Sequence, residues 1–139
     1  MRVVFDSNVL LAALLFTGGR AEAAVTRILE GRDELVLSAP ILREILAVLA
    51  TKFSRDKEDL SRVAVVLGEM GTLVEPSRRL SAFADEPDNR TLECAVEGKA
   101  EAIVTGDKAM LAAGEYEGIR LITLGDYLDQ PRSGGKRHA

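Results

Sequence analysis

Short apolar runs alternate with helical patterns along the whole chain, and this alternation constrains the fold more than any other feature. The apolar runs are rich in Val, Ile, Leu and Thr, and they are RVVF (2–5), LVLS (35–38), TLVE (72–75), AIVT (102–105) and IRLIT (119–123). They lack the inside-outside alternation of a half-solvated sheet, which predicts strands that are covered on both faces. Strands that alternate with helices pack as a mostly parallel sheet between helical layers. We therefore expect a three-layer α/β/α fold with a five-stranded, mostly parallel sheet.

Helical patterns fill the intervals between these strands. They cover residues 9–16, 21–30, 38–50, 57–70, 89–100 and 108–113, with a partial turn at LGDYLD. Asp56 and Asp88 are in position to cap the fourth and fifth of these helices, and Ser7 and Asn8 to cap the first. The apolar helices at 9–16 and 41–49 could serve either a dimer interface or the core, and we favour the core.

Length and composition bound the organisation of the chain. With 139 residues, 47% of them hydrophobic, the chain fits a single domain at 1–129 followed by a basic tail at 130–139 that we expect to be disordered. No apolar stretch reaches the roughly 20 residues of a membrane span, and no signal sequence opens the chain, so we expect a cytoplasmic protein that binds no membrane. The single Cys94 is expected to fill the core.

The distribution of charge limits how this protein could bind nucleic acid. All 22 acidic residues precede Pro131, whereas three of the 18 basic residues follow it, so residues 1–131 carry a net charge of −7. A body of that charge binds a phosphate backbone poorly unless cations intervene.

Four acidic residues are expected to meet at one edge of the sheet. Asp6 directly follows the first predicted strand, and Asp107 follows the fourth. Glu44 and Asp88 lie near the starts of helices that run antiparallel to the strands, which places them at the same edge. Such a cluster repels itself unless a hard divalent cation supplies the counter-charge, and Mg²⁺ or Mn²⁺ prefers oxygen ligands. A carboxylate site that holds Mg²⁺ suits phosphoryl chemistry.

Each of these acids also has a structural interpretation when taken alone. Asp88 and Asp107 could be helix caps, and Glu44 could be a solvated helix residue. Asp6 is the hardest to explain by structure alone, because the residues around it are apolar. The hypothesis of a metal site therefore depends on the four acids as a set.

Four segments, in their order and spacing, resemble the PIN-domain nucleases, and within them the VapC-like toxins of bacterial and archaeal toxin–antitoxin pairs. These segments are VVFDSNVLLAAL, LSAPILREILAVL, DEPDNRTLECA and AIVTGDKAML, and the resemblance spans residues 2 to about 128. Carried over by position, the catalytic and metal-binding acids of the family are Asp6, Glu44, Asp88 and Asp107. Its supporting neighbours are Ser7, Asn8, Thr105 and Glu93, of which Glu93 points about 140° away from Asp88 around the helix and is not expected to bind metal directly.

The resemblance implies a Mg²⁺- or Mn²⁺-dependent endoribonuclease, often dimeric and often neutralised by a small antitoxin protein. Four basic residues on segments near the same edge are candidate contacts to RNA phosphates, namely Arg20, Arg43, Arg90 and Lys108. No aromatic platform for stacking bases is evident.

Three alternatives remain open from the sequence. The chain could be a PIN-like nuclease that processes RNA or cuts DNA, or a non-catalytic module that binds RNA or protein. It could also be a phospho-acceptor receiver domain, although a receiver would carry adjacent acids after its first strand and an acceptor Asp after its third, where this chain offers only Glu75.

Overall fold

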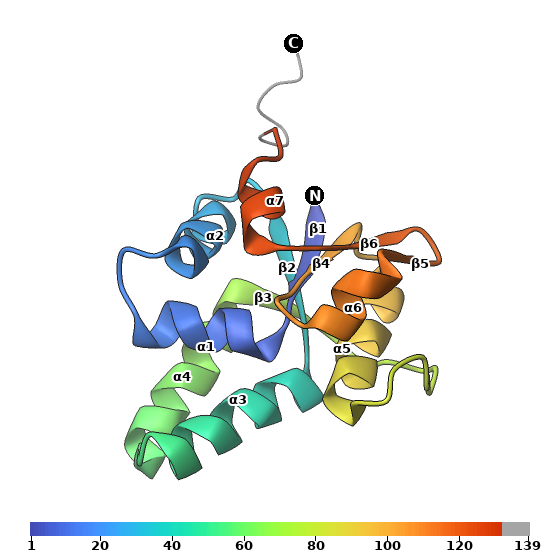
Figure 1. Ribbon diagram of the computed structural model, residues 1–139. Coiled ribbons are helices and arrows are strands. Elements are labelled where there is room, and N and C mark those ends of the chain that lie inside the picture. Colours follow the sequence, from blue (N-terminus) through green and yellow to red (C-terminus); the bar gives the residue numbers. More distant parts are fainter. Residues whose placement is uncertain (132–139) are drawn as a thin grey trace.

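The computed structural model describes residues 1–131, and the rest of the predicted tail, 132–139, lies outside the described residues (Figure 1). Strands and helices alternate as the sequence predicts. The strands are β1 (Arg2–Phe5), β2 (Glu34–Ser38), β3 (Gly71–Val74), β4 (Ala102–Val104), β5 (Glu115–Tyr116) and β6 (Ile119–Ile122). The helices are α1 (Ser7–Leu15), α2 (Arg20–Leu29), α3 (Ala39–Lys52), α4 (Lys57–Met70), α5 (Glu86–Glu97), α6 (Lys108–Ala113) and α7 (Leu124–Leu128).

The strands form one sheet in the order β3-β2-β1-β4-β6-β5. The five predicted strands are all parallel to their neighbours, as expected. The predicted strand count of five is wrong by one, because the two-residue β5 adds an antiparallel partner to β6. Gly118, at a positive φ of 86°, makes the tight turn between them.

Only the central strands are covered on both faces. Every residue of β4 is buried, and so are three of the four residues of β1 and four of the five of β2. The edge strand β3 differs from the prediction, because none of its four residues is buried and Leu73 is 58% exposed. An edge strand has a neighbour on one side only, which leaves more of its surface open to solvent.

Helices cover the two faces of the sheet (Figure 1). On one face α1 packs against α2, which in turn contacts α7, and on the other face α5 lies against β1, β2 and β4. Helix α3 contacts both α1 and α5 at the carboxyl edge of the strands. Its Ile41, Ile45 and Leu49 are buried, as is Leu10 of α1, so these apolar helices serve the core as expected. Cys94 also lies in the core, where burial raises the pKa of its thiol to about 12.

Among the described residues no single helix is long and apolar enough to cross a membrane, and α1 with α2 meets that criterion only as a pair bent by 98°.

Candidate metal centre

The order in which strands are added to the sheet reverses between β1 and β4, and this switch point places Asp6 beside Thr105. The chain builds outward from β1 to β2 and β3, then returns to the other side of β1 as β4. Phe5 and Val104 are aligned in register at the carboxyl ends of the two strands. The Asp6 backbone N–H continues the ladder by donating to the Val104 carbonyl at 3.1 Å. A crevice outside the strands at such a point is where α/β sheets gather functional groups.

Asp6 is held in a fixed orientation by two hydrogen bonds. Its Oδ1 accepts from the Val9 backbone N–H at 2.9 Å, and its Oδ2 accepts from the Thr105 hydroxyl at 2.5 Å. Asp6 is therefore the cap of α1, and the prediction that Ser7 and Asn8 cap this helix is wrong. The strand ends at Phe5, so the first residue with extended backbone before the helix is Asp6, and its short carboxylate reaches the free N–H of the first turn.

Asp107 enters from the turn that follows β4. Its backbone N–H donates to the Thr105 hydroxyl at 3.0 Å, and its Oδ1 accepts from the Met110 backbone N–H at 3.0 Å. The Asp107 carboxylate thus caps α6, as its structural interpretation requires. The Thr105 hydroxyl joins Asp6 and Asp107 in one hydrogen-bonded unit.

Helix α5 brings two acids to this edge, one of which the sequence reasoning missed. The prediction that Asp88 caps this helix is wrong, because α5 begins at Glu86 and its cap position is Asp85. The signal was Pro87, which is tolerated in the first turn of a helix and so sets the start before Asp88. The Asp85 side chain makes no capping hydrogen bond, which leaves its carboxylate available for a ligand.

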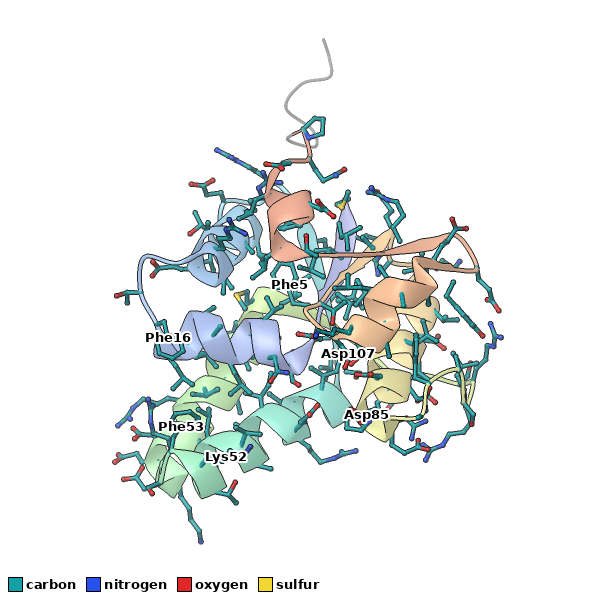
Figure 2. All side chains as sticks on the ribbon, in the orientation of Figure 1. Phe5, Phe16, Lys52, Phe53, Asp85 and Asp107 are labelled. Carbon is teal, nitrogen blue, oxygen red and sulfur yellow. The ribbon has the colours of Figure 1, made fainter. Side chains whose placement is uncertain are left out.

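Asp85, Asp88 and Asp107 form what we call the acid cluster. One carboxylate oxygen from each lies within 4.8 Å of the other two, a spacing that fits a single cation between them. Figure 2 shows Asp85 and Asp107 where α5 and α6 begin, although their chain positions are far apart. Asp88 is only 9% exposed, and its buried Oδ2 has no hydrogen-bond partner. A buried carboxylate oxygen without a donor is costly, and a cation would satisfy it.

The electrostatics of the cluster also favour a cation. Burial, followed by the charges of Asp107 and Asp85, raises the pKa of Asp88 to about 7. Burial likewise raises the pKa of Asp6, with Asp107 acting in the same direction and the hydrogen bonds from Thr105 and Val9 opposing it. The charge of Asp107 thus raises the pKa of both Asp6 and Asp88. A divalent ion would reverse that effect.

Glu44 lies near the acid cluster and is not a member of it. It lines a 200 Å³ groove between the starts of α3 and α5, together with Glu86 and Arg90. The structure therefore brings three of the four predicted acids into one electrostatically coupled group, Asp6, Asp88 and Asp107, and places Glu44 across a groove.

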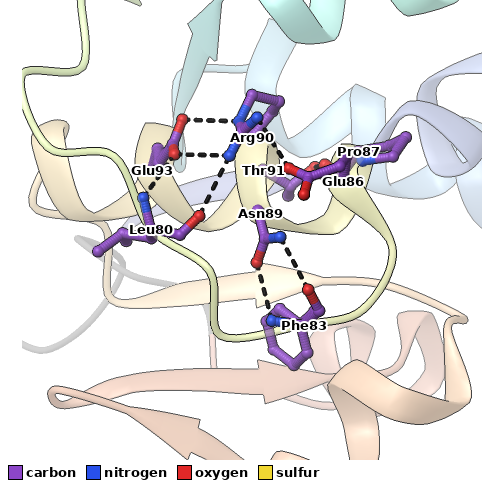
Figure 3. A network of polar contacts seen from close by, with 8 residues as sticks. All are labelled: Leu80, Phe83, Glu86, Pro87, Asn89, Arg90, Thr91 and Glu93. Carbon is purple, nitrogen blue, oxygen red and sulfur yellow. Dashed lines mark hydrogen bonds and ion pairs between the residues drawn. The ribbon is translucent and has the colours of Figure 1, made fainter.

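Arg90 and Glu93 tie the loop before α5 to that helix (Figure 3). The Arg90 guanidinium donates two hydrogen bonds to the Glu93 carboxylate at 2.9 Å each, and one to the Leu80 carbonyl at 3.1 Å. Its remaining nitrogen pairs with Glu86 at 3.0 Å. Glu93 also accepts from the Leu80 backbone N–H, and it does not face the acid cluster. Every nitrogen of the Arg90 guanidinium therefore bonds to an acceptor within the protein. Arg90 thus holds the loop that carries Asp85 against α5.

The remaining predicted residues surround the cluster. Ser7 is buried in the first turn of α1, and Asn8 follows it with an exposed side chain. Arg20, Arg43 and Lys108 are exposed on α2, α3 and α6, and none of them makes a side-chain hydrogen bond or ion pair within residues 1–131. These three cations are available to a ligand.

Comparison with known proteins agrees with this architecture. The sequence matches the PIN domain family model over residues 2–109. The chain belongs to the PIN domain family. Proteins with this domain are generally nucleases that use divalent metals, which is in keeping with the acid cluster at the switch point.

Two known proteins are similar to this chain, one in sequence and one in fold. The chain is 27% identical over 116 residues to the uncharacterized protein MJ1680 of Methanocaldococcus jannaschii, covering 81% of this chain and 74% of that protein. Its fold is similar to a chain in the crystal structure of VapBC2 from Rickettsia felis bound to a DNA fragment from their promoter. The TM-score is 0.65 and the identity 13%, with 88% of this chain and 98% of that chain covered. The likeness to the VapBC2 chain is therefore a likeness of fold.

Proposed function

We propose that this PIN domain is a Mg²⁺- or Mn²⁺-dependent endoribonuclease and the toxin of a toxin–antitoxin pair. The observation that carries the proposal is the acid cluster near Asp6, one member of which, Asp88, has a buried carboxylate oxygen without a hydrogen-bond partner. Family membership supports hydrolysis of a nucleic acid, and it argues against the receiver alternative.

In this proposal the three residues of the acid cluster hold the metal, and Asp6 supplies a further carboxylate beside them. Asp85, Asp88 and Asp107 would each supply one oxygen, which suits a hard cation that takes few protein ligands. A bound Mg²⁺ or Mn²⁺ supplies an activated water and neutralises charge on the phosphate. Asp6, whose carboxylate is fixed by hydrogen bonds from Thr105 and the Val9 backbone N–H, would serve as a general base at this site.

The residues around the cluster would position the RNA. Glu44, the fourth acid of the family pattern, lines the groove beside α5 and would contact the RNA substrate there. Arg43 and Lys108 would contact backbone phosphates, which offsets part of the net charge of −7 on residues 1–131.

Cleavage of a 5′-labelled single-stranded RNA tests the proposal. Wild-type protein should cut it with Mn²⁺ and fail with a chelator. Asp6→Asn should reduce the rate about 100-fold or more, equivalent to about 2.7 kcal/mol of transition-state stabilisation. Asn caps a helix as well as Asp does, so the fold should persist. Glu69→Gln, which changes an exposed acid on α4, is the matched control. Equal cleavage by wild type and Asp6→Asn would refute the proposal.

The biological role is a separate element of the proposal. The fold likeness to a VapBC2 complex supports an antitoxin partner. Exposed apolar side chains on the α1–α2–α4 side support a protein partner there, with Phe16 65% and Leu29 68% exposed. Induced expression should arrest growth, and co-expression of the product of the adjacent gene should relieve the arrest. Normal growth despite active enzyme would instead favour an RNA-processing nuclease. Light scattering will show whether the exposed side chains join two copies of the chain.

A further inference from the structure

A second pocket lies directly beside the acid cluster, bounded by α1, α2, the turn after β4 and the start of α7. Its volume is 430 Å³, within the range of roughly 300–1,000 Å³ typical of small-molecule sites. Thr105 and Gly106 line its floor, and the same Thr105 hydroxyl bonds to Asp6. Thr105 therefore lies at the boundary between the pocket and the candidate metal centre. We call it the Arg20 pocket.

The walls of the Arg20 pocket are apolar, which does not suit a phosphate or a metal ion. They are formed by the side chains of Val9, Ala12, Leu111 and Leu124. Walls of this kind suit a flat, uncharged group that has lost its water.

A few polar groups reach into the Arg20 pocket with their hydrogen-bonding capacity unused. The Asn8 amide and the Arg20 guanidinium have no side-chain partner within the described part of the chain. The Thr123 hydroxyl accepts from the Asp126 backbone N–H, which leaves its own proton free to donate. Apolar walls with a few free donors and acceptors are what a nucleobase requires, because its edge carries hydrogen-bonding groups and its faces do not.

The Arg20 guanidinium lies against Gly125. A Cβ placed on Gly125 would lie 3.3 Å from Arg20 Nη1 and 3.8 Å from Thr123 Oγ1. The guanidinium is thus laid against the backbone of α7 at the pocket wall. An Arg plane in such a place is a surface on which an unpaired base stacks, and this supplies the platform that the few aromatic residues do not.

We propose that the Arg20 pocket is a nucleobase subsite, which takes the base of a nucleotide adjoining the scissile phosphate of single-stranded RNA. The inference rests on the proposed ribonuclease function, and it adds base recognition to it. Arg20 stacks on the base, Asn8 and Thr123 read its edge, and the shared Thr105 sets its distance from Asp6.

Binding of neutral nucleosides tests the subsite without any cleavage. Adenosine, guanosine, cytidine and uridine are titrated separately into ¹⁵N-labelled protein without metal. At least one nucleoside should produce saturable shifts in the amide signals of Gly106 and Gly125 and in the Arg20 Nε signal. Gly125→Leu fills the pocket and should abolish these shifts, whereas Gly68→Leu, on an exposed face of α4 with open space around it, should not.

Cleavage of oligonucleotides with one abasic position supplies a second readout. In wild type, loss of the base at one position beside the cut should slow cleavage about tenfold or more, equivalent to about 1.4 kcal/mol. In Arg20→Met and Gly125→Leu that position should become insensitive to loss of its base, while Arg79→Met, a matched loss of an exposed Arg, should behave as wild type.

The outcomes separate the subsite from the nuclease. Nucleoside shifts without cleavage of any RNA would support the subsite and refute the proposed function. Cleavage without saturable shifts from any of the four nucleosides, or with equal sensitivity to abasic positions in wild type and Gly125→Leu, would overturn the subsite and leave the nuclease standing.

Discussion

At the scale of single residues, Asp88 couples the stability of the metal-free protein to pH. The pKa of this carboxyl is raised from 3.8 to about 7 in the folded protein. Between these values the unfolded chain ionises first, so the folded state holds more protons. The free energy of unfolding therefore has a contribution from Asp88 that is full below about pH 4 and is lost as the pH rises to about 7.

Asp88→Asn should remove this dependence. With a chelator present at about pH 8, the variant should be more stable than wild type by roughly 1–3 kcal/mol, and the difference should vanish near pH 4. Denaturant unfolding across this pH range measures it, with Glu69→Gln as the exposed control. A wild-type protein whose stability rises between pH 4 and 7 relative to Asp88→Asn would contradict the assigned charge state.

Asp85 and Glu44 differ in their distance from the cation proposed for the acid cluster. Asp85→Asn should weaken Mn²⁺ binding about tenfold or more, or about 1.4 kcal/mol, because Asp85 contributes an oxygen to the cluster. Glu44→Gln should change the affinity much less, since Glu44 lines the neighbouring groove. Calorimetric titration with Mn²⁺ compares the two variants. A greater loss of Mn²⁺ affinity in Glu44→Gln than in Asp85→Asn would place the ion nearer to α3.

At the scale of elements, α5 is fixed at both ends, and its C-terminus lies tightly against β2. A Cβ on Gly98 would lie 2.3 Å from Val36 Cγ1, which is closer than two carbon atoms can approach. Gly98→Ala should therefore cost about 1–3 kcal/mol through overpacking. Gly68→Ala, in an exposed part of α4, should instead stabilise by about 0.5–1 kcal/mol. Equal stability changes in the two variants would show that α5 does not depend on this close approach.

The loop before α5 is held by Asn89 at the N-terminal end of the same helix (Figure 3). The buried Asn89 amide accepts from the Phe83 backbone N–H and donates to the Phe83 carbonyl, both at 2.8 Å. Asn89→Ala should destabilise by about 1–3 kcal/mol, because it leaves two backbone groups without partners.

Hydrogen exchange shows where the Asn89→Ala effect acts. Amides of residues 76–85 should exchange faster than in wild type, and Mn²⁺ affinity should fall because this loop delivers Asp85. Thr51→Ala removes the hydrogen bond that the exposed Thr51 hydroxyl donates to the Ala47 carbonyl on α3. This variant should leave the exchange of residues 76–85 and the Mn²⁺ affinity unchanged. Unaltered exchange in residues 76–85 would show that Asn89 does not position the loop.

At the scale of the whole molecule, the sequence predicted the parallel α/β architecture and missed details that depend on tertiary contacts. The alternation of strands and helices decided the fold class, since parallel strands need crossover helices. The exposure of β3 and the existence of β5 were not predictable from periodicity, because both depend on what lies beside an edge of the sheet. The two helix starts were misplaced for local reasons, as Pro87 and the end of β1 show.

The candidate site was predictable where it follows from topology. The carboxyl-edge rule places Asp6 and Asp107 together because β1 and β4 are neighbours at the switch point. The rule could not show that Asp85 belongs to the acid cluster and that Glu44 does not. That distinction depends on where α5 begins, to within one residue, and on the direction of each side chain. The commitment of the Arg90 guanidinium to Glu93 and Leu80 was also hidden, because it depends on a loop that only the folded chain brings to α5.

The central claim is that the acid cluster holds a divalent cation, and anomalous diffraction from crystals grown with Mn²⁺ tests it most directly. At the manganese absorption edge, we predict an anomalous peak between the carboxylates of Asp85, Asp88 and Asp107. The peak should disappear in Asp107→Asn. A protein that cleaves RNA with Mn²⁺ and yet shows no peak there, or a peak at another place, would contradict the account.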